Sequence, residues 1–287
     1  MAFNLKSLVV KIGVAKILNK CLIRMGFSSL QWAPYLSSEL DGVIPPRELW
    51  VGRADPLSHF LRWPYEYRAY LTLLCQMRQD ASVLELACNH GRTNLALLDY
   101  LRPPGRYEGL DILPKHIEFA QSEIHKRYPI FNYTHADINN KLYNPNGRLK
   151  AEDYIFPYPE DRFDIIYAAS LFTHLLPPDC ANYFKQSRRV LREPGQCLFS
   201  FFVLDWYRGS GTSVAQIYEF DHPLEGFQGA AVYNPRAPEH VIAYSVSAIE
   251  RMASDAGLKV KRILPGYWSN THQLSVNEQD LVLLEAV

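Results

Sequence analysis

The chain has 287 residues, and its 30 basic and 30 acidic side chains give a formal net charge of zero. Its length and its apolar content of 48% suffice for one large domain, or for a domain with a cap. The balanced charge and the lack of any nucleic-acid-binding signature argue against a DNA or RNA partner.

Cysteine usage indicates a reducing compartment. The five cysteines are odd in number and lack CxxC spacing, so they match neither a disulfide framework nor a zinc site. We therefore expect reduced, mostly buried thiols in a cytoplasmic protein. We predict no metal site, although a bound divalent ion stays open. The cysteines are Cys21, Cys75, Cys88, Cys180 and Cys197.

The first 38 residues are basic: they contain Lys6, Lys11, Lys16, Lys20 and Arg24 and no acidic residue. The lysines interrupt every apolar run, which excludes a membrane-spanning helix and argues against a secretory signal. Three interpretations stay open. The segment is a helix packed on the main domain, a basic helix (residues 1–30) in peripheral contact with an anionic membrane, or an organellar targeting peptide.

Residues 40–66 are rich in proline and aromatic side chains, which predicts an irregular but packed lid. A helix is predicted over 66–77. We therefore assign residues 1–78 to an N-terminal basic helix, lid and cap, and residues 79–287 to the main domain.

The sequence over 83–101 predicts a buried strand, a tight turn and a helix. The strand contains Glu85, and leucines at helical spacing follow Gly91. In doubly wound α/β folds this junction binds nucleotides. Gly91 suits a sharp bend, and Asn89 is a residue type that tolerates a left-handed backbone. Twenty residues after Gly91 a second strand ends in Asp111, the offset expected of a carboxylate that binds a ribose diol.

Predicted strands and helices alternate from residue 79 onwards, which indicates an α/β fold with a mostly parallel sheet. Two aromatic-rich insertions, 139–162 and 205–244, are predicted to form walls on the substrate side. Only a loop joins the last two strands, so they should pair antiparallel. The predicted strands are 83–86, 106–112, 131–138, 163–170, 196–204, 258–264 and 280–286; further helices are predicted over 114–128, 179–191 and, from a capping box at 247–250, up to Gly257.

The segment from Glu85 to Gly91 resembles motif I of the class I S-adenosylmethionine (SAM)-dependent methyltransferases. Ala87 and Asn89 replace two of the three glycines in this motif. The missing glycines and the acid disfavour a dinucleotide pyrophosphate, whereas SAM carries a sulfonium and an ammonium group. The segment 189–195 also resembles a turn of this superfamily. Together these likenesses cover roughly 79–287 and imply a Rossmann-like class I methyltransferase sheet, mostly parallel with an antiparallel last strand, and an N-terminal helical cap.

The resemblance also implies a set of SAM-binding residues. Asp111 would hold the ribose, and Asp137 would accept a hydrogen bond from the adenine amine unless it only caps a helix or turn. The cofactor-binding residues implied in this way are Glu85, Ala87, Cys88, Asn89, Gly91, Asp111, Ile112, Asp137, Ile138, Ala169 and Ser170.

Four short motifs, at 44–46, 143–147, 172–176 and 265–269, resemble a bacterial subgroup associated with polysaccharide and glycolipid biosynthesis. This resemblance implies O-methylation of a sugar hydroxyl on a small-molecule, glycan or glycolipid acceptor.

A sugar hydroxyl is a weak nucleophile that gains from a general base, and imidazole has a well-matched pKa. His174, just beyond the fourth strand, is the predicted base; alternatively it caps the next helix or packs under the lid. His222 and His240 are the reserve candidates. Two other functions stay open: a catalytically silent SAM-binding scaffold, and an NAD-dependent oxidoreductase.

Overall fold

The computed structural model describes residues 43–46, 49, 57–209, 218–270, 275 and 277–287. The chain divides into two compact units, Met1–Ile44 and Pro45–Val287, and the elements described below belong to the second. The predicted basic helix at 1–30 lies outside the described residues, as do residues 40–42, 47–48 and 50–56 of the predicted lid.

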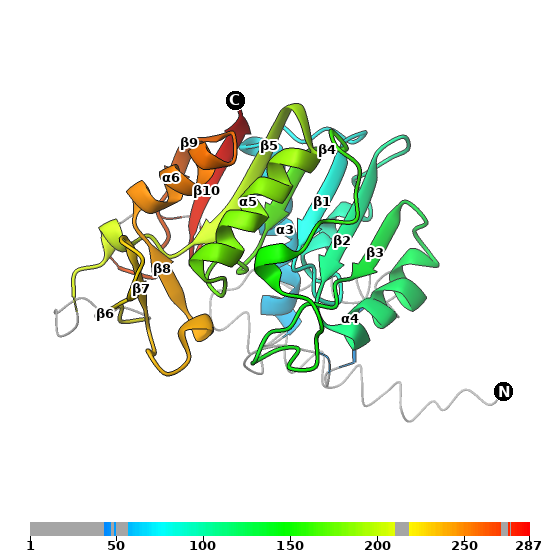
Figure 1. Ribbon diagram of the computed structural model, residues 1–287. Helices are drawn as coiled ribbons and strands as arrows, with labels where there is room; N and C mark the ends of the chain where they lie inside the picture. The colour runs from blue at the N-terminus through cyan, green and yellow to red at the C-terminus, as the bar shows by residue number, and fades with distance from the viewer. Residues whose placement is uncertain (1–42, 47–48, 50–56, 210–217, 271–274, 276) are drawn as a thin grey trace, which may run out of the picture. The chain divides into compact units, whose positions relative to one another are not determined.

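A seven-stranded sheet in the order β3-β2-β1-β4-β5-β10-β9 forms the centre of this unit (Figure 1). The strands from β3 to β5 in this order run parallel. β10 is antiparallel to both neighbours, β5 and β9. This confirms the predicted fold class, including the antiparallel end. The strands are β1 Ser82–Leu86, β2 Arg106–Asp111, β3 Phe131–His135, β4 Phe163–Ala168, β5 Leu191–Phe201, β9 Leu258–Leu264 and β10 Asp280–Ala286.

Helices cover the sheet because its central strands are apolar on both faces. Side chains alternate between the two faces of a strand, so Ile166 and Ala168 of β4 join the core cluster that also contains residues of α5 (Pro177–Val190) and α6 (Val246–Asp255). Tyr167 between them contacts Tyr67 of α3 (Leu57–Leu73), with ring centroids 6.0 Å apart. In Figure 1, α5 lies in front of the sheet and α3 behind it.

Several predicted helix boundaries are wrong. The segment after β1 forms only a short 3₁₀ helix, Thr93–Leu97; all five of its residues are buried, so packing and not a long hydrogen-bond ladder stabilises it. α4 (Pro114–Phe119) begins at its proline as predicted, but it continues as a π-helical turn, Ala120–His125. α3 begins nine residues before the predicted start at Glu66 and ends at Leu73.

The predicted capping box at 247–250 is also wrong. The N-cap lies two residues earlier, at Ser245, which accepts a hydrogen bond from the Ala248 amide at 3.2 Å, and α6 begins at Val246. The start of the fifth strand also differs from the prediction. β5 begins at Leu191 and not at Gln196, and residues 193–195 form an irregularity inside it, between the pairs Phe163–Leu191 and Ile165–Gln196.

The two insertions have structure of their own. The first, 139–162, contains a β-bridge between Asn140 and Asn144 and the 3₁₀ helix Ala151–Asp153, and a second bridge joins its Leu149 to Ile138. The second, 205–244, forms an antiparallel sheet of β6 (His222–Pro223), β7 (Ala230–Val232) and β8 (Ile242–Tyr244). Residues of β7 and β8 belong to the main core cluster, so the second insertion is an integral part of the domain.

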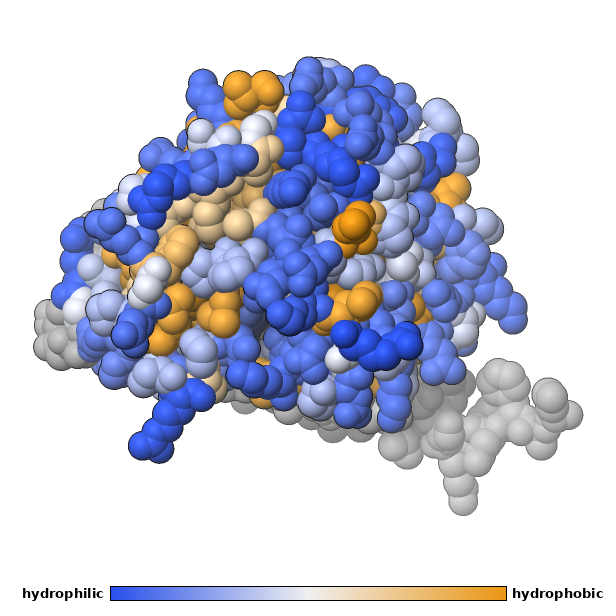
Figure 2. Space-filling model, in the orientation of Figure 1, coloured by the Kyte–Doolittle hydropathy of each residue, from blue (hydrophilic) through white to orange (hydrophobic). Residues whose placement is uncertain are grey.

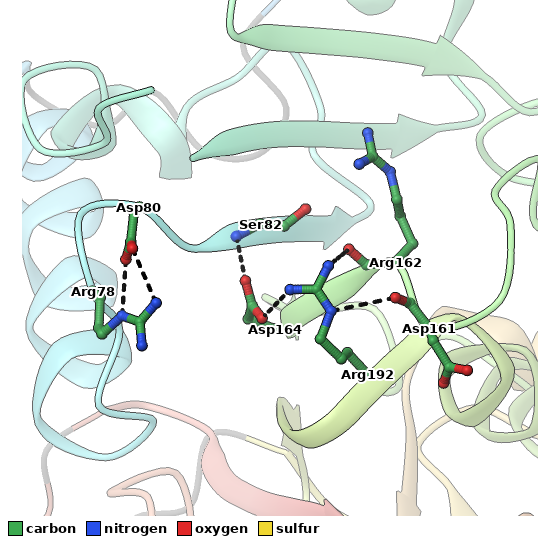
Figure 3. Close-up of polar contacts among 7 residues, drawn as sticks. All are labelled: Arg78, Asp80, Ser82, Asp161, Arg162, Asp164 and Arg192. Atoms are coloured by element: carbon green, nitrogen blue, oxygen red, sulfur yellow. Dashed lines mark hydrogen bonds and ion pairs between the residues drawn. The ribbon is translucent and has the colours of Figure 1, made fainter. Parts of the chain in front are cut away.

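A polar clamp joins the amino-terminal ends of three central strands (Figure 3). Asp164 accepts a hydrogen bond from the Ser82 amide at 2.7 Å and forms an ion pair with Arg192 at 2.7 Å. Arg192 also donates to the backbone carbonyls of Asp161 and Arg162, each at 3.4 Å. The clamp fixes β1, β4 and β5 at their amino-terminal ends. Ligand sites of α/β proteins lie at the other edge of the sheet, at the carboxyl ends of the strands.

The face in Figure 2 is mostly hydrophilic with scattered apolar residues. Among the described residues, no helix is both long and apolar enough to cross a membrane.

Candidate functional site

A cavity of about 510 Å³ lies at the carboxyl ends of β1, β2 and β4. Eight of the predicted site residues line it. From the first turn these are Ala87 and Asn89. At or just after the ends of β2 and β3, which lie on one side of β1, they are Asp111, Ile112 and Ile138. Ala169, Ser170 and His174 line it after β4, and Trp63 of α3 contributes from the predicted lid.

The turn after β1 adopts a glycine-type backbone without two of the glycines. The φ angles of Ala87, Asn89 and Gly91 are 59°, 54° and 85°, all in the left-handed region. This conformation costs an ordinary residue about 1–2 kcal/mol. Asn89 offsets part of that cost, because its side chain accepts a hydrogen bond from the His90 amide at 2.8 Å. The loop shape of motif I therefore persists at Ala87 and Asn89.

Asp111 is held at the end of β2 with its carboxylate on the cavity wall. Its two oxygens accept hydrogen bonds from the amides of Asn89, at 2.7 Å, and Leu113, at 2.8 Å. Burial raises the pKa of Asp111 to about 6, although these hydrogen bonds act in the opposite direction. A carboxylate oxygen accepts at two lone pairs, so each oxygen keeps capacity for a ligand hydroxyl.

Glu85 lies below the turn and does not line the cavity. It alternates with Leu84 and Leu86 along β1 and therefore points to the opposite face of the sheet. Its buried carboxylate accepts hydrogen bonds from Thr93, Tyr107 and Tyr167, the last at 2.6 Å. Burial raises its pKa to about 7. Since Thr93 lines the cavity, Glu85 reaches the site only through this hydroxyl.

We expect Glu85→Gln to lower the free energy of unfolding by about 1–3 kcal/mol, because one amide oxygen cannot accept from all three hydroxyls. Its affinity for SAM should fall more than its affinity for neutral adenosine if the charge also acts on the ligand. Urea unfolding and calorimetry measure the two effects. Tyr167→Phe, which removes one donor and keeps the charge, is the control; equal losses for both ligands would leave Glu85 a purely structural role.

Three further predicted cofactor residues lie away from the cavity wall. Cys88 is fully buried, with its amide donating to Leu110. Gly91 shapes the turn: a Cβ there would lie 2.6 Å from Ile124. The Asp137 carboxylate forms an ion pair with Arg148, which lowers its pKa, while its neighbour Ile138 lines the cavity. Asp137 thus contacts the first insertion in the structure, and its contact with adenine stays a prediction.

Two residues that no sequence motif marks, Ser200 and Gln279, fix the wall at Ser170. Ser170 has a left-handed φ of 59°. Its amide donates to Ser200 Oγ at 2.7 Å, and its hydroxyl accepts from Gln279 Nε2 at 2.8 Å. Ser200 in turn donates to Gln279 Oε1 at 2.7 Å, which closes a ring of hydrogen bonds. No local sequence pattern links these residues, because 109 positions separate Ser170 from Gln279.

His174 lies on the cavity wall between the two insertions. Its Nδ1 is 3.3 Å from the backbone carbonyl of Glu239. A carbonyl oxygen only accepts, so Nδ1 carries the proton and Nε2 keeps its lone pair. Burial lowers the pKa of His174 below its ordinary value of 6.5, so the imidazole is neutral at pH 7.

Tyr143, Asp179 and Glu239 line the same end of the cavity. Burial raises the pKa of Asp179 to about 6. The reserve bases do not line the cavity: His222 is exposed in β6, and the ring of His240 contacts Tyr233 at 6.2 Å. Within the described ranges, no three His, Cys, Asp or Glu side chains are grouped as a metal site requires.

Comparisons with known proteins assign the family. A model of the methyltransferase domain matches residues 58–263. The chain belongs to the methyltransferase domain family. This methyltransferase is similar in structure to the CcbJ methyltransferase from Streptomyces caelestis, with a TM-score of 0.51 and 15% identity over 84% of this chain and 94% of that chain.

Two more solved structures share the fold. The 1,6-didemethyltoxoflavin-N1-methyltransferase from Burkholderia thailandensis, solved with S-adenosylhomocysteine, has a TM-score of 0.50 at 14% identity, over 89% of this chain and 86% of that chain. The mitomycin 7-O-methyltransferase MmcR has a TM-score of 0.50 at 13% identity, over 80% of this chain and 55% of that chain. The methyltransferase thus shares its fold with enzymes named for N- and O-methylation.

The cavity of the methyltransferase fits SAM as cofactor. Asp111 has free lone pairs for a ribose diol, and the turn of Ala87 and Asn89 lies beside it. The alternative of an NAD-dependent oxidoreductase is disfavoured by the antiparallel β10 and by the family. The family and the cavity therefore both support SAM.

Proposed function

We propose that this methyltransferase transfers a methyl group from SAM to a hydroxyl of a sugar-containing small molecule, glycan or glycolipid, with His174 as general base. The observation that carries the proposal is the placement of His174 on the cavity wall, with Nδ1 directed to the Glu239 carbonyl and Nε2 left as the proton acceptor. The short motifs that resemble the polysaccharide-associated subgroup support the class of acceptor.

When bound, SAM supplies an electrophilic methyl group, and the chain has to hold the cofactor and the acceptor in line and exclude water. Asp111 would hold the ribose. Backbone at Ala87, Asn89 and Ser170 would line the rest of the cofactor site. His174 would take the hydroxyl proton at Nε2, which makes the acceptor oxygen a stronger nucleophile.

Incubation with methyl-labelled SAM tests the proposal. The acceptors are a panel of methyl pyranosides, a simple phenol and a simple amine, followed by extracts of the source organism. Label on an oxygen of a glycoside or a glycan supports the proposal. Label on the amine alone would overturn O-methylation. Binding of SAM without transfer to any acceptor would favour the catalytically silent scaffold.

We also propose that the protein is cytoplasmic and contacts an anionic membrane through residues 1–30. Support comes from the acid-free basic sequence and from the described cysteines, Cys75, Cys88, Cys180 and Cys197, which are free and buried.

Deletion of residues 1–30 should leave SAM affinity unchanged and should abolish pelleting with phosphatidylserine-containing vesicles at low salt. The reason is that basic side chains near an anionic surface contribute about 1 kcal/mol each, and salt screens this attraction. Neutral phosphatidylcholine vesicles are the control. Equal pelleting of the full and shortened chains at low and high salt would return the segment to a packed helix or a targeting peptide.

A further inference from the structure

A preformed loop in the first insertion carries an aromatic side chain to the candidate base. Over 139–149 the chain folds back on itself: the amide and carbonyl of Asn140 pair with those of Asn144 at 3.0 and 2.9 Å. The Asn140 side chain accepts from the amides of Leu142 and Tyr143, both at 3.0 Å. Asn144 Nδ2 donates to the Ile138 carbonyl at 2.9 Å. The backbone of Tyr143 is therefore fixed from several directions.

Gly147 shows how closely this loop packs against the segment that follows β3. A Cβ at this position would lie 2.3 Å from the backbone of Ile138, so any other residue would force the loop away. Ile138 lines the cavity. The loop is thus attached directly to the cavity wall, and its geometry is coupled to the wall.

Tyr143 extends from this loop into the cavity and meets His174. The two ring centroids are 5.7 Å apart, and the planes are inclined by 81°. On another side the Glu239 carbonyl holds Nδ1 of His174, so both insertions contact one imidazole. Within the described residues the Tyr143 hydroxyl makes no hydrogen bond, and burial raises its pKa, so it stays a neutral donor. The contact to His174 is made by the ring.

We infer that Tyr143 is a positioning residue for His174: its ring, held by the 139–149 loop, shields the imidazole from water and fixes it so that Nε2 stays available to the acceptor. This inference rests on the proposed role of His174 as base. Its physical basis is that edge-to-face ring pairs attract each other beyond the effect of their burial, which favours this one orientation of the imidazole. The other groups that face the imidazole are the backbone at Glu239 and at His240 and the side chain of His240.

The test follows the titration of His174 in the full chain by NMR with histidine-selective labelling. His174→Gln identifies the signal among the nine histidines. In wild type the pKa should lie below 6.5, because burial disfavours the charged ring. In Tyr143→Ala it should move up toward 6.5, because water reaches the imidazole. Tyr143→Phe, which keeps the ring, should titrate as wild type.

Leu142→Ala is the matched control, since Leu142 lies on the same loop and is 56% exposed. Calorimetry with SAM reports whether each variant is folded. If Tyr143→Ala does not fold, Asn140→Ala decides the question, because it removes the acceptor for the Tyr143 amide and should also raise the pKa of His174. The inference would be overturned if the His174 titration were unchanged in a folded Tyr143→Ala variant. If Tyr143→Ala does not fold, an unchanged titration in Asn140→Ala would overturn it. Failure of wild type to transfer label to any acceptor would instead overturn the proposed function, whatever the titration shows.

Discussion

His174→Ala should lower the rate of methyl transfer by about 10²–10⁴-fold while the affinity for SAM stays nearly unchanged. A general base acts on the acceptor proton in the transition state and does not bind the cofactor. The structure supports this separation, because His174 is held by the Glu239 carbonyl and Tyr143, whereas the ribose-binding candidate Asp111 is held by two amides at the end of β2. Single-turnover kinetics with saturating SAM measure the rate, and calorimetry measures the affinity.

The pH dependence provides an independent check on His174. Only the neutral imidazole accepts a proton, so the wild-type rate should rise with pH through the pKa of His174, which burial places below 6.5, and then level off. This inflection should be absent in His174→Ala. His174→Gln keeps a hydrogen-bonding group but cannot take the proton. If the glutamine variant retained most of the activity, His174 would only orient the acceptor.

Asp111→Ala should weaken SAM binding by at least about tenfold. Hydrogen bonds to a sheltered carboxylate contribute about 1.5–3 kcal/mol each, and about 1.4 kcal/mol corresponds to a factor of ten. The loss has a second source: without the carboxylate, the amides of Asn89 and Leu113 lose their acceptor and the turn loosens. Calorimetry with SAM tests this expectation, with thermal unfolding as a check on the fold. Unchanged affinity would remove Asp111 from the site.

SAM binding by wild type should also weaken as the pH falls from 7 to 5. Burial raises the pKa of Asp111 to about 6, so protonation in this interval removes a lone pair that ribose would use. Ligand binding to the ionised form releases a proton, and the affinity therefore falls below the pKa. Asp111→Asn, which does not titrate, should bind weakly at every pH in this range. A wild-type affinity that is flat between pH 5 and 7 would contradict this role.

Much of the sheet could be predicted from the sequence because it depends on local patterns. Apolar runs alternating with helical segments indicate parallel strands, and the loop between the strands 258–264 and 280–286 indicates antiparallel pairing, as β9 and β10 show. Asp111 could be predicted as a cavity residue for the same reason: strand ends lie at known edges of a parallel sheet. The structure places its carboxylate there.

The remaining features depend on contacts between distant residues, which a single sequence does not encode in any local pattern. Glu85 has the acidic chemistry expected beside a sulfonium, but strand alternation turns it toward Tyr107 and Tyr167, and these hydroxyls satisfy it. Asp137 forms an ion pair with Arg148 of the first insertion. The error at the start of α6 has a local cause instead: Ser245 and Ser247 are equally good caps by type, and the N-cap is Ser245.

The position of β10 affects how the domain folds while it is being synthesised. β10 lies between β5 and β9, and it is the element that joins β9 to the rest of the sheet. A nascent chain therefore carries β9 and α6 before their partner strand has left the ribosome, and the edge of β5 is unpaired during that interval. Such long-range pairing is slow and leaves strand edges open to association. Premature termination before Asp280 would thus expose an aggregation-prone sheet edge, and cellular quality control would have to recognise it.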